Sequence, residues 1–315
     1  MTSAPDPATR RVIGPVEVGV LTVGASALGD PRVDDDTAAA TITAALTGPL
    51  TVLDTSNGYG RSEERIGAVL RALGGVPTGH LVATKVDPAP GEHDFSGDRV
   101  RRSIEESLDR LGVDHLPLVH LHDPERLTFA QATAADGPLE ALLALRDEGV
   151  IGLVGVAGGP AAMMERFVRL GVFDAAVTHN RFTLLDRSAE PLLDAAAEHG
   201  VAVFNAAPFG GGMLAKDLPA GATPTYAYRP ASPEHVAAHT AIRAACARHG
   251  VPVPAAALQL STRDPRVTST IVGATRPQQI DDALAWARHP IPDVLWDELA
   301  ALVPDQRVWL GPDGR

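Results

Sequence analysis

A regular alternation of short apolar runs with longer helical patterns most constrains the fold of this chain. Eight runs rich in β-branched or small apolar residues recur along the sequence, and helical periodicity follows them. They lie near residues 16–24, 50–54, 81–86, 115–122, 150–158, 173–180, 201–209 and 268–274. Strands that alternate with helices are typical of parallel sheets, and nearly continuous apolar runs are typical of strands covered on both faces. The pattern predicts a single-domain α/β fold, a (β/α)8 TIM barrel.

The helical segments support this prediction. In the segment 97–112, Val100, Ile104, Leu108 and Leu111 recur every three or four residues, which places them on one face of a helix. A doubly wound open sheet shows the same alternation, but such sheets usually have fewer strands, and no GxGxxG follows an early strand here. The barrel is the better prediction, and it places the chemistry at the carboxyl ends of the strands.

Three ranges divide the chain. We expect residues 1–15, which are polar and Pro-rich, to be a flexible arm, residues 16–289 to form the barrel, and residues 290–315 to be a C-terminal tail packed on it. Residues 209–232 form the longest stretch without clear periodicity, so they are interpreted as a lid or substrate loop, with a floppy insertion as the alternative. Its candidate contacts are Tyr226, Tyr228 and Arg229. Trp286, in an Ala-rich helical pattern, is expected in the core.

Composition narrows the functional classes. A formal net charge of −12 argues against a sequence-independent nucleic-acid surface. The single cysteine, Cys246, excludes an intrachain disulfide and any CxxC metal or redox motif, which suits a reducing cytoplasm. No apolar run has transmembrane length, and no secretory signal follows the N-terminal basic pair. We expect a soluble cytoplasmic protein without nucleic-acid or membrane partners, and no feature of the sequence predicts an oligomeric state.

Four polar residues follow early apolar runs. Asp54 and Tyr59 lie in LDTSNGYG, Lys85 in LVATK and His122 in LPLVHLHD. A phenol titrates near pH ~10, and a neighbouring lysine held charged by an aspartate stabilises the phenolate, so the three make a tunable proton donor. A histidine beside them can orient a substrate oxygen. Each residue alone is more often structural, but four at successive strand ends indicate a site.

These motifs resemble the aldo-keto reductase superfamily. DTxxxYG with SEExIG, then ATK and LHDP, carry the resemblance, which extends from about Val18 to about Leu284. It implies that Tyr59 is the general acid or base and that His122 orients a carbonyl. NRFTLLDR, FNAAPFGGGMLA and LHDPE are similar to the aldose 1-dehydrogenase branch, with its L-fucose and D-threo-aldose dehydrogenases. This similarity implies a small-molecule carbonyl or sugar substrate and, for sugars, oxidation at C1 to a lactone.

The resemblance also implies a nicotinamide dinucleotide held by loops after the late strands. Glycines let the backbone approach a pyrophosphate, and Arg276 at a helix start can meet a phosphate, although Gly-rich turns and an exposed arginine are equally ordinary surface features. The candidate cofactor residues are His179, Asn180, Pro208, Phe209, Gly210, Gly212, Gly273, Ala274, Thr275, Arg276 and Gln279.

Several of these positions depart from the common family pattern. Ala206 replaces a frequent tyrosine, Ala157 and Gly158 replace a serine-asparagine pair, and His179 replaces a glutamine. In the last loop Gly273, Ala274, Gln279 and Ala283 stand where residues that select a 2′-phosphate or contact adenine are frequent. Arg276 alone favours phosphate, so the cofactor is NADP or NAD, with NADP slightly preferred.

Two other functions remain open from the sequence. His120 and His122 are two residues apart on one predicted strand, so both point to one face and could bind a metal in a barrel hydrolase, with Asp54 as a further ligand. More often such a His120 is a packed interior residue, and no metal site is assigned. A reductase-like barrel could also serve as a cofactor-sensing subunit, but the complete set of four residues favours catalysis.

Overall fold

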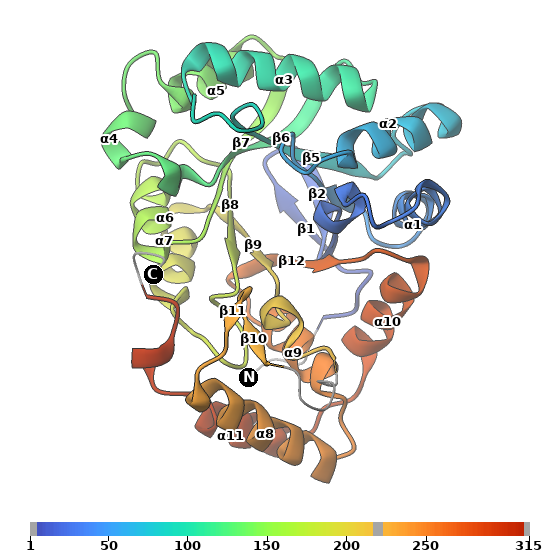
Figure 1. Ribbon diagram of the computed structural model, residues 1–315, viewed down its shortest axis with the longest axis vertical. Coiled ribbons are helices and arrows are strands. Elements are labelled where there is room, and N and C mark those ends of the chain that lie inside the picture. Colours follow the sequence, from blue (N-terminus) through green and yellow to red (C-terminus); the bar gives the residue numbers. More distant parts are fainter. Residues whose placement is uncertain (1–4, 217–222, 312–315) are drawn as a thin grey trace.

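The computed structural model describes residues 5–216 and 223–311 of the 315-residue chain. Within these ranges, eight parallel strands close into a barrel (Figure 1). In order around the barrel they are β12 (Val267–Gly273), β3 (Leu21–Gly24), β4 (Val52–Asp54), β5 (Leu81–Val86), β6 (Leu116–His122), β7 (Ile151–Gly158), β8 (Ala175–His179) and β9 (Ala202–Ala206). β9 pairs with β12 and closes the ring. The predicted (β/α)8 barrel is confirmed.

Helices surround the barrel and connect its strands (Figure 1). The helices that follow the barrel strands include α1 (Asp35–Thr47), α2 (Ser62–Leu73), α3 (Gly97–Leu111), α5 (Pro138–Asp147), α6 (Ala161–Val168), α7 (Glu190–His199), α9 (Val253–Thr262) and α10 (Pro277–Arg288). α3 illustrates the local signals: the Ser96 side chain caps its start by accepting from Arg99 N, and Gly112 ends it in the left-handed conformation. Its predicted face is confirmed, because Val100, Ile104 and Leu111 are buried.

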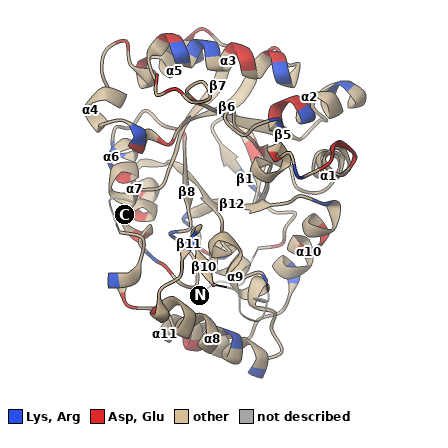
Figure 2. Cartoon of the chain, viewed as in Figure 1, with Lys and Arg blue, Asp and Glu red and all other residues tan. Residues whose placement is uncertain are grey.

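The structure contains further helices besides these. α4 (Phe129–Ala132), α8 (Pro233–Arg248) and α11 (Asp293–Ala301) are α-helices, and η1 (Ser26–Gly29), η2 (Pro124–Arg126), η3 (Gly210–Gly212) and η4 (Gln306–Val308) are 3-10 helices. Figure 2 shows Lys and Arg interspersed with Asp and Glu along α3 and α5. Arg101 and Glu148 form one such ion pair, with an N–O distance of 2.7 Å. In the described part of the chain, no helix combines the length and apolar character needed to cross a bilayer.

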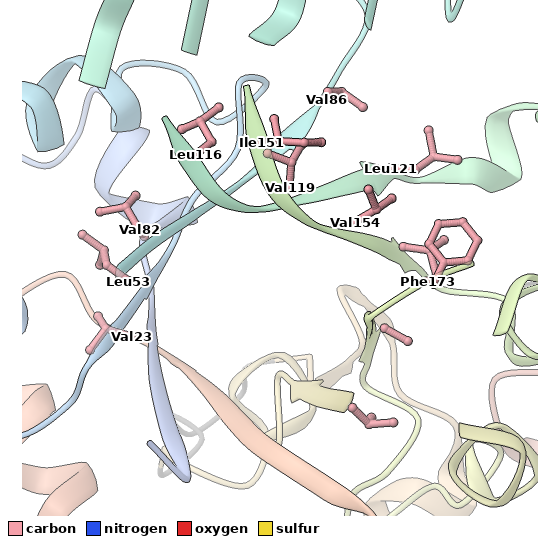
Figure 3. Close-up of a cluster of buried hydrophobic side chains, with 14 of the residues drawn as sticks. Val23, Leu53, Val82, Val86, Leu116, Val119, Leu121, Ile151, Val154 and Phe173 are labelled. Atoms are coloured by element: carbon pink, nitrogen blue, oxygen red, sulfur yellow. The ribbon is translucent and has the colours of Figure 1, made fainter. Parts of the chain in front are cut away.

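Two apolar layers explain why the strands read as continuous apolar runs. Leu53, Val82 and Val119 belong to the cluster between strands and helices, part of which Figure 3 shows. Their sequence neighbours Val52 and Leu118 belong to a second cluster inside the barrel. Side chains alternate between the two faces of a strand, so a strand covered on both faces needs apolar residues at consecutive positions.

The N-terminal segment is more ordered than predicted. β1 (Arg10–Ile13) pairs antiparallel with β2 (Val16–Gly19), so residues 10–13 of the expected flexible arm form a strand. Ile13 and Val18 are buried in the inner cluster, and burial of these side chains stabilises the hairpin. The first apolar run is therefore two strands, and only its second half, β3, joins the barrel. Residues 1–4 of the expected arm lie outside the described residues.

The segment 209–232 contains a small hairpin, and its residues 217–222 lie outside the described part. β10 (Thr225–Tyr226) pairs antiparallel with β11 (Arg229–Pro230). The Tyr226 hydroxyl is buried and donates to the Asn180 carbonyl oxygen at 2.6 Å, so Tyr226 has a structural role, unlike the substrate contact considered from the sequence. In the C-terminal range, α11 packs against α8 and buries Leu295, Trp296 and Leu299.

Candidate active site

Lys85 and Asp54 form a buried ion pair at the carboxyl ends of β5 and β4. The Lys85 Nζ atom donates to Asp54 Oδ2 at 2.8 Å and to the Thr55 carbonyl oxygen at 2.6 Å. Lys85 is 2% exposed and Asp54 is 6% exposed. Burial by itself lowers the pKa of Lys85, but the interactions with Asp54 and Tyr59 together outweigh it and raise the pKa. Lys85 is therefore an ammonium ion at neutral pH.

Tyr59 lies beside this pair, on the loop between β4 and α2. The Lys85 Nζ atom is 4.6 Å from the centre of the Tyr59 ring. Burial raises the pKa of Tyr59, and this effect is larger than the lowering by Lys85. The phenol therefore holds its proton at neutral pH. Lys85 acts in the direction predicted from the sequence, but the burial that opposes it was not visible there.

The loop that carries Tyr59 is tightly packed against η1. A Cβ atom at Gly29 would come within 1.7 Å of the Tyr59 carbonyl oxygen, so this approach requires glycine. The Arg65 guanidinium of α2 holds the segment around η1 in place. It donates to the Val33 carbonyl oxygen at 2.6 Å and to the Leu28 carbonyl oxygen at 2.5 Å. Backbone contacts therefore set the place of Tyr59.

His122 ends β6 and faces Tyr59, with the two ring centres 5.5 Å apart and nearly perpendicular. Its Nδ1 atom is 2.8 Å from Asp87 Oδ1 and 3.2 Å from Ser56 Oγ. Burial by itself raises the pKa of Asp87, but hydrogen bonds from His122, Ser56 and the Gly58 amide hold it below its usual value. Asp87 and Ser56 were missed by the sequence analysis, although Asp87 follows Lys85 at the end of the same apolar run.

His120 lies deeper in the barrel than His122. It is 1% exposed and packs edge-on against Phe204, with ring centres 6.3 Å apart. Burial holds the pKa of His120 well below its usual value, so the ring is neutral. Among the residues that the structure describes, no three His, Cys, Asp or Glu side chains are grouped to hold a metal ion. His120 is a packed interior residue, and the metal-dependent hydrolase has no support.

A cavity of about 900 Å³ opens above these residues. Asp54, Tyr59, Lys85 and His122 all line it, so the structure brings the four predicted catalytic residues together. Six predicted cofactor residues line it too, namely His179, Phe209, Gly212, Gly273, Thr275 and Gln279. The other five predicted cofactor residues are not among the lining side chains: Asn180, Pro208, Gly210 and Ala274 are buried, and Arg276 is exposed at the start of α10.

Trp286 is a lining residue that the sequence analysis placed in the core. It is half-buried on α10 and faces the cavity beside Phe209, with ring centres 5.6 Å apart. Gln279, Ala283 and Trp286 all line the cavity, and their spacing of four and three residues places them on one face of α10. That spacing was the sequence signal that could have placed Trp286 beside Gln279 at the cavity. A tryptophan next to small residues on such a face provides a flat apolar wall.

His179 contributes a neutral ring to the same cavity. Burial, with a smaller effect of the nearby Arg181 charge, lowers its pKa to about 4. Its Nδ1 atom lies 3.2 Å from Asn180 Nδ2. At neutral pH His179 can therefore hydrogen bond to a ligand without adding a charge.

Comparisons with known proteins agree with this geometry. The sequence model of the Aldo/keto reductase family matches residues 20–304. D-threo-aldose 1-dehydrogenase from Pseudomonas sp is 32% identical over 310 residues, covering 90% of this chain and 93% of that protein. L-galactose dehydrogenase from Arabidopsis thaliana is 32% identical over 279 residues, covering 86% of this chain and 84% of that protein. An aldo-keto reductase structure from Bacillus halodurans, in its holo form, shares the fold at a TM-score of 0.78 and 22% identity, covering 97% of this chain and 99% of that one.

The family match covers most of the chain, and the alignments with the two sugar dehydrogenases cover 93% and 84% of those proteins. The resemblance inferred from short motifs is thus confirmed. The chain belongs to the Aldo/keto reductase family, and it is an oxidoreductase that acts on carbonyl or alcohol groups with a nicotinamide cofactor.

Proposed function

We propose that this protein oxidises a free aldose at C1, converting the cyclic hemiacetal into a lactone. The observation that carries the proposal is the convergence of Tyr59, Lys85 and His122 on one cavity of about 900 Å³. Asp30, Asp123 and Lys216 line the same cavity and offer polar groups to sugar hydroxyls. The names of the two relatives, D-threo-aldose 1-dehydrogenase and L-galactose dehydrogenase, support a sugar as the substrate class.

In this mechanism Tyr59 moves the proton. In the oxidative direction its phenolate oxygen takes the proton of the C1 hydroxyl, and in the reductive direction the phenol gives the proton to the carbonyl oxygen. The Lys85 ammonium, paired with Asp54 at 2.8 Å, stabilises the phenolate. His122 orients the reacting oxygen. When bound, a nicotinamide dinucleotide supplies hydride transfer at the substrate carbon.

The loops after β9 and β12 suit such a dinucleotide. Gly212 and Gly273 line the cavity, and a Cβ atom at Gly273 would meet nothing within 4 Å, so the backbone there is open to a ligand. At the start of α10 the amides of Thr275 and Arg276 donate to Gln279 Oε1 at 2.7 and 3.2 Å. A phosphate oxygen can replace this amide oxygen, because helix N-termini favour anions.

We expect NADP to be preferred over NAD, because the Arg276 side chain is exposed beside that helix start. A guanidinium can bind a 2′-phosphate through two hydrogen bonds. Arg276→Ala should weaken NADPH binding about tenfold, the equivalent of one charge-assisted hydrogen bond, and leave NADH binding unchanged. Fluorescence titration of both cofactors measures this. Equal losses for the two cofactors would exclude Arg276 as the selecting residue.

The cytoplasm is the compartment we propose. Cys246 is the single cysteine of the chain, and it is buried. Burial raises the pKa of its thiol to about 11, so it stays protonated and unreactive at neutral pH. A chain without disulfides suits a reducing compartment, and its partners there are small-molecule carbonyl or sugar substrates.

The test is a screen of aldoses with NAD and NADP, and of aldehydes with the reduced cofactors, for the wild type and Tyr59→Phe. We expect lactone formation by the wild type, and a loss of kcat on the order of 10²–10⁴ in the variant. Cofactor affinity should be nearly unchanged, because the lost hydroxyl acts on the reacting oxygen. Near wild-type kcat in Tyr59→Phe would refute proton transfer by Tyr59. Turnover of aldehydes without any oxidation of aldoses would refute the aldose as the substrate.

A further inference from the structure

Asn57 is a buried side chain on the loop between β4 and α2, two residues before Tyr59. It is 7% exposed and is not among the residues that line the cavity. Its amide points to α3: Oδ1 accepts from Arg99 Nη2 at 3.3 Å, and Nδ2 donates to the Ser103 carbonyl oxygen at 3.2 Å and to Glu106 Oε2 at 3.1 Å. A guanidinium can only donate, whereas a carbonyl and a carboxylate can only accept, so this orientation of the amide satisfies all three contacts.

The partners of Asn57 on α3 are themselves held in place. Arg99 and Glu106 form a two-point ion pair, with distances of 2.7 Å from Nη1 to Oε1 and 2.8 Å from Nη2 to Oε2. These hydrogen bonds hold the pKa of Glu106 below its usual value, so it is a carboxylate at neutral pH. Arg99 is 3% exposed, and its Nε atom also donates to the Asp87 carbonyl oxygen at 2.9 Å. Asn57 therefore contacts groups whose positions are set by α3 and by the end of β5.

The backbone of the same loop is held on both sides. Arg110 of α3 donates from Nη1 to the Asn57 carbonyl oxygen at 3.1 Å. The Gly58 amide donates to Asp87 Oδ2 at 2.9 Å, and a Cβ atom at Gly58 would come within 2.8 Å of that carboxyl group, so the loop passes close to the end of β5. On the other side, the Tyr59 carbonyl oxygen packs against η1. Only Gly58 separates the anchored Asn57 from Tyr59, which lines the cavity.

We propose that Asn57 is a positioning residue that fixes its loop to α3 and thereby keeps the Tyr59 hydroxyl at the reacting oxygen. A displacement of about 1 Å at a reacting group can cost on the order of 10²-fold in rate, so this link acts on turnover although Asn57 lies outside the cavity. The inference rests on proton transfer by Tyr59, which belongs to the proposed function, but it does not depend on which carbonyl or sugar is the substrate.

Asn57→Asp tests this link with little change of shape. A carboxylate oxygen then replaces the Nδ2 donor opposite the Ser103 carbonyl oxygen and the Glu106 carboxylate, so two attractive contacts become repulsive. Adding Glu106→Gln reverses one of them, because the new amide can donate to the new carboxylate, and the sum of the charges equals that of the wild type. Ile104→Val is the matched control, because it destabilises α3 at its buried face without changing a polar contact of the loop.

The rate of hydride transfer is measured in single turnovers by the stopped-flow loss of NADPH fluorescence, with 4-nitrobenzaldehyde as the carbonyl probe. We expect Asn57→Asp to slow this step roughly 10- to 10²-fold, while the Kd of NADPH changes by less than about twofold. The variant with Glu106→Gln added should be at least about threefold faster than Asn57→Asp alone, and Ile104→Val should transfer hydride at the wild-type rate.

Four kinetic outcomes would overturn the proposal. They are a wild-type rate in Asn57→Asp, a double variant no faster than Asn57→Asp, an equal slowing in Ile104→Val, and a loss of NADPH affinity in Asn57→Asp as large as its loss of rate. The first two would show that the link to Glu106 does not matter for turnover. The last two would show that Asn57 supports the fold in general.

Hydrogen exchange of the full-length protein gives a readout that needs no turnover. The amides of residues 57–59 each donate to an oxygen atom of the protein, at distances of 2.9 to 3.3 Å. Asn57→Asp should accelerate exchange in the peptide that covers residues 55–62 about tenfold, the effect of one lost hydrogen bond, and leave the peptides of β7 and α6 unchanged. Unchanged exchange in residues 55–62, or equal acceleration throughout the protein, would show that Asn57 does not fix the loop.

The two hypotheses fail separately, because Tyr59→Phe is measured beside these variants. If Tyr59→Phe transfers hydride at nearly the wild-type rate, proton transfer by Tyr59 is wrong, and the exchange data alone decide whether Asn57 fixes the loop. If Tyr59→Phe is slow but Asn57→Asp is as fast as the wild type, the inference is refuted and the role of Tyr59 stands.

Discussion

Removing the Lys85 charge is expected to destabilise the fold as well as the chemistry. Asp54 is 6% exposed and its Oδ2 atom accepts from Lys85 Nζ at 2.8 Å, so Lys85→Met leaves a buried carboxyl group without its partner. Loss of one partner of a buried pair costs about 3–5 kcal/mol. The Thr55 carbonyl oxygen loses the same donor, which costs about 1 kcal/mol more. We therefore expect the free energy of unfolding, measured in urea at pH 7, to decrease by an amount near the upper end of that range.

The double variant Asp54→Asn with Lys85→Met separates the cost of leaving a buried charge unpaired from the cost of the lost contacts. It removes both charges, so it should be more stable than Lys85→Met by about 2 kcal/mol or more, and the two single variants complete a double-mutant cycle. The reasoning is refuted if Lys85→Met loses less than about 1 kcal/mol, the value typical of an exposed salt bridge. It also fails if the double variant loses the sum of the two single losses.

Three further outcomes follow from the geometry. Because burial raises the pKa of Tyr59, the phenolate fraction should grow about tenfold per pH unit between pH 7 and 9, and kcat/KM for oxidation should rise with it; a plateau below pH 8 in the pH profile would contradict this. Gly29→Ala places a Cβ atom within 1.7 Å of the Tyr59 carbonyl oxygen, so it should lower the free energy of unfolding by about 1–3 kcal/mol and reduce turnover. Wild-type stability and turnover would show that the loop moves to accommodate the methyl group. Trp286→Ala removes the apolar wall beside Phe209, so calorimetric titration should show NADP binding weakened roughly tenfold; unchanged affinity would place the dinucleotide elsewhere.

The identity of the four convergent side chains was predictable because parallel strands share a direction. Asp54 and His122 end their strands and Lys85 is the next-to-last residue of its own, and the carboxyl ends of adjacent parallel strands lie at one end of a barrel. Once the alternation of strands and helices is recognised, their proximity follows from topology alone. The consecutive apolar positions of each strand were equally informative, because both faces of every barrel strand are covered.

Other features depended on contacts between residues far apart in sequence. The hairpin of β1 and β2 was missed because its stability comes from burying Ile13 and Val18 inside the barrel, which local polarity does not reveal. Trp286 was assigned to the core because an Ala-rich helix pattern predicts which face is apolar but does not say whether that face meets the barrel or the cavity.

The sequence by itself determined the barrel and the residue types at its chemical end, because both depend on periodicity and chain order. Only the tertiary structure decided how those residues behave. The burial that raises the pKa of Tyr59, and the contact of Asp87 with His122 across 35 positions of sequence, depend on distances and solvent exposure. Such quantities arise when the strands close into a ring, and no local pattern encodes them.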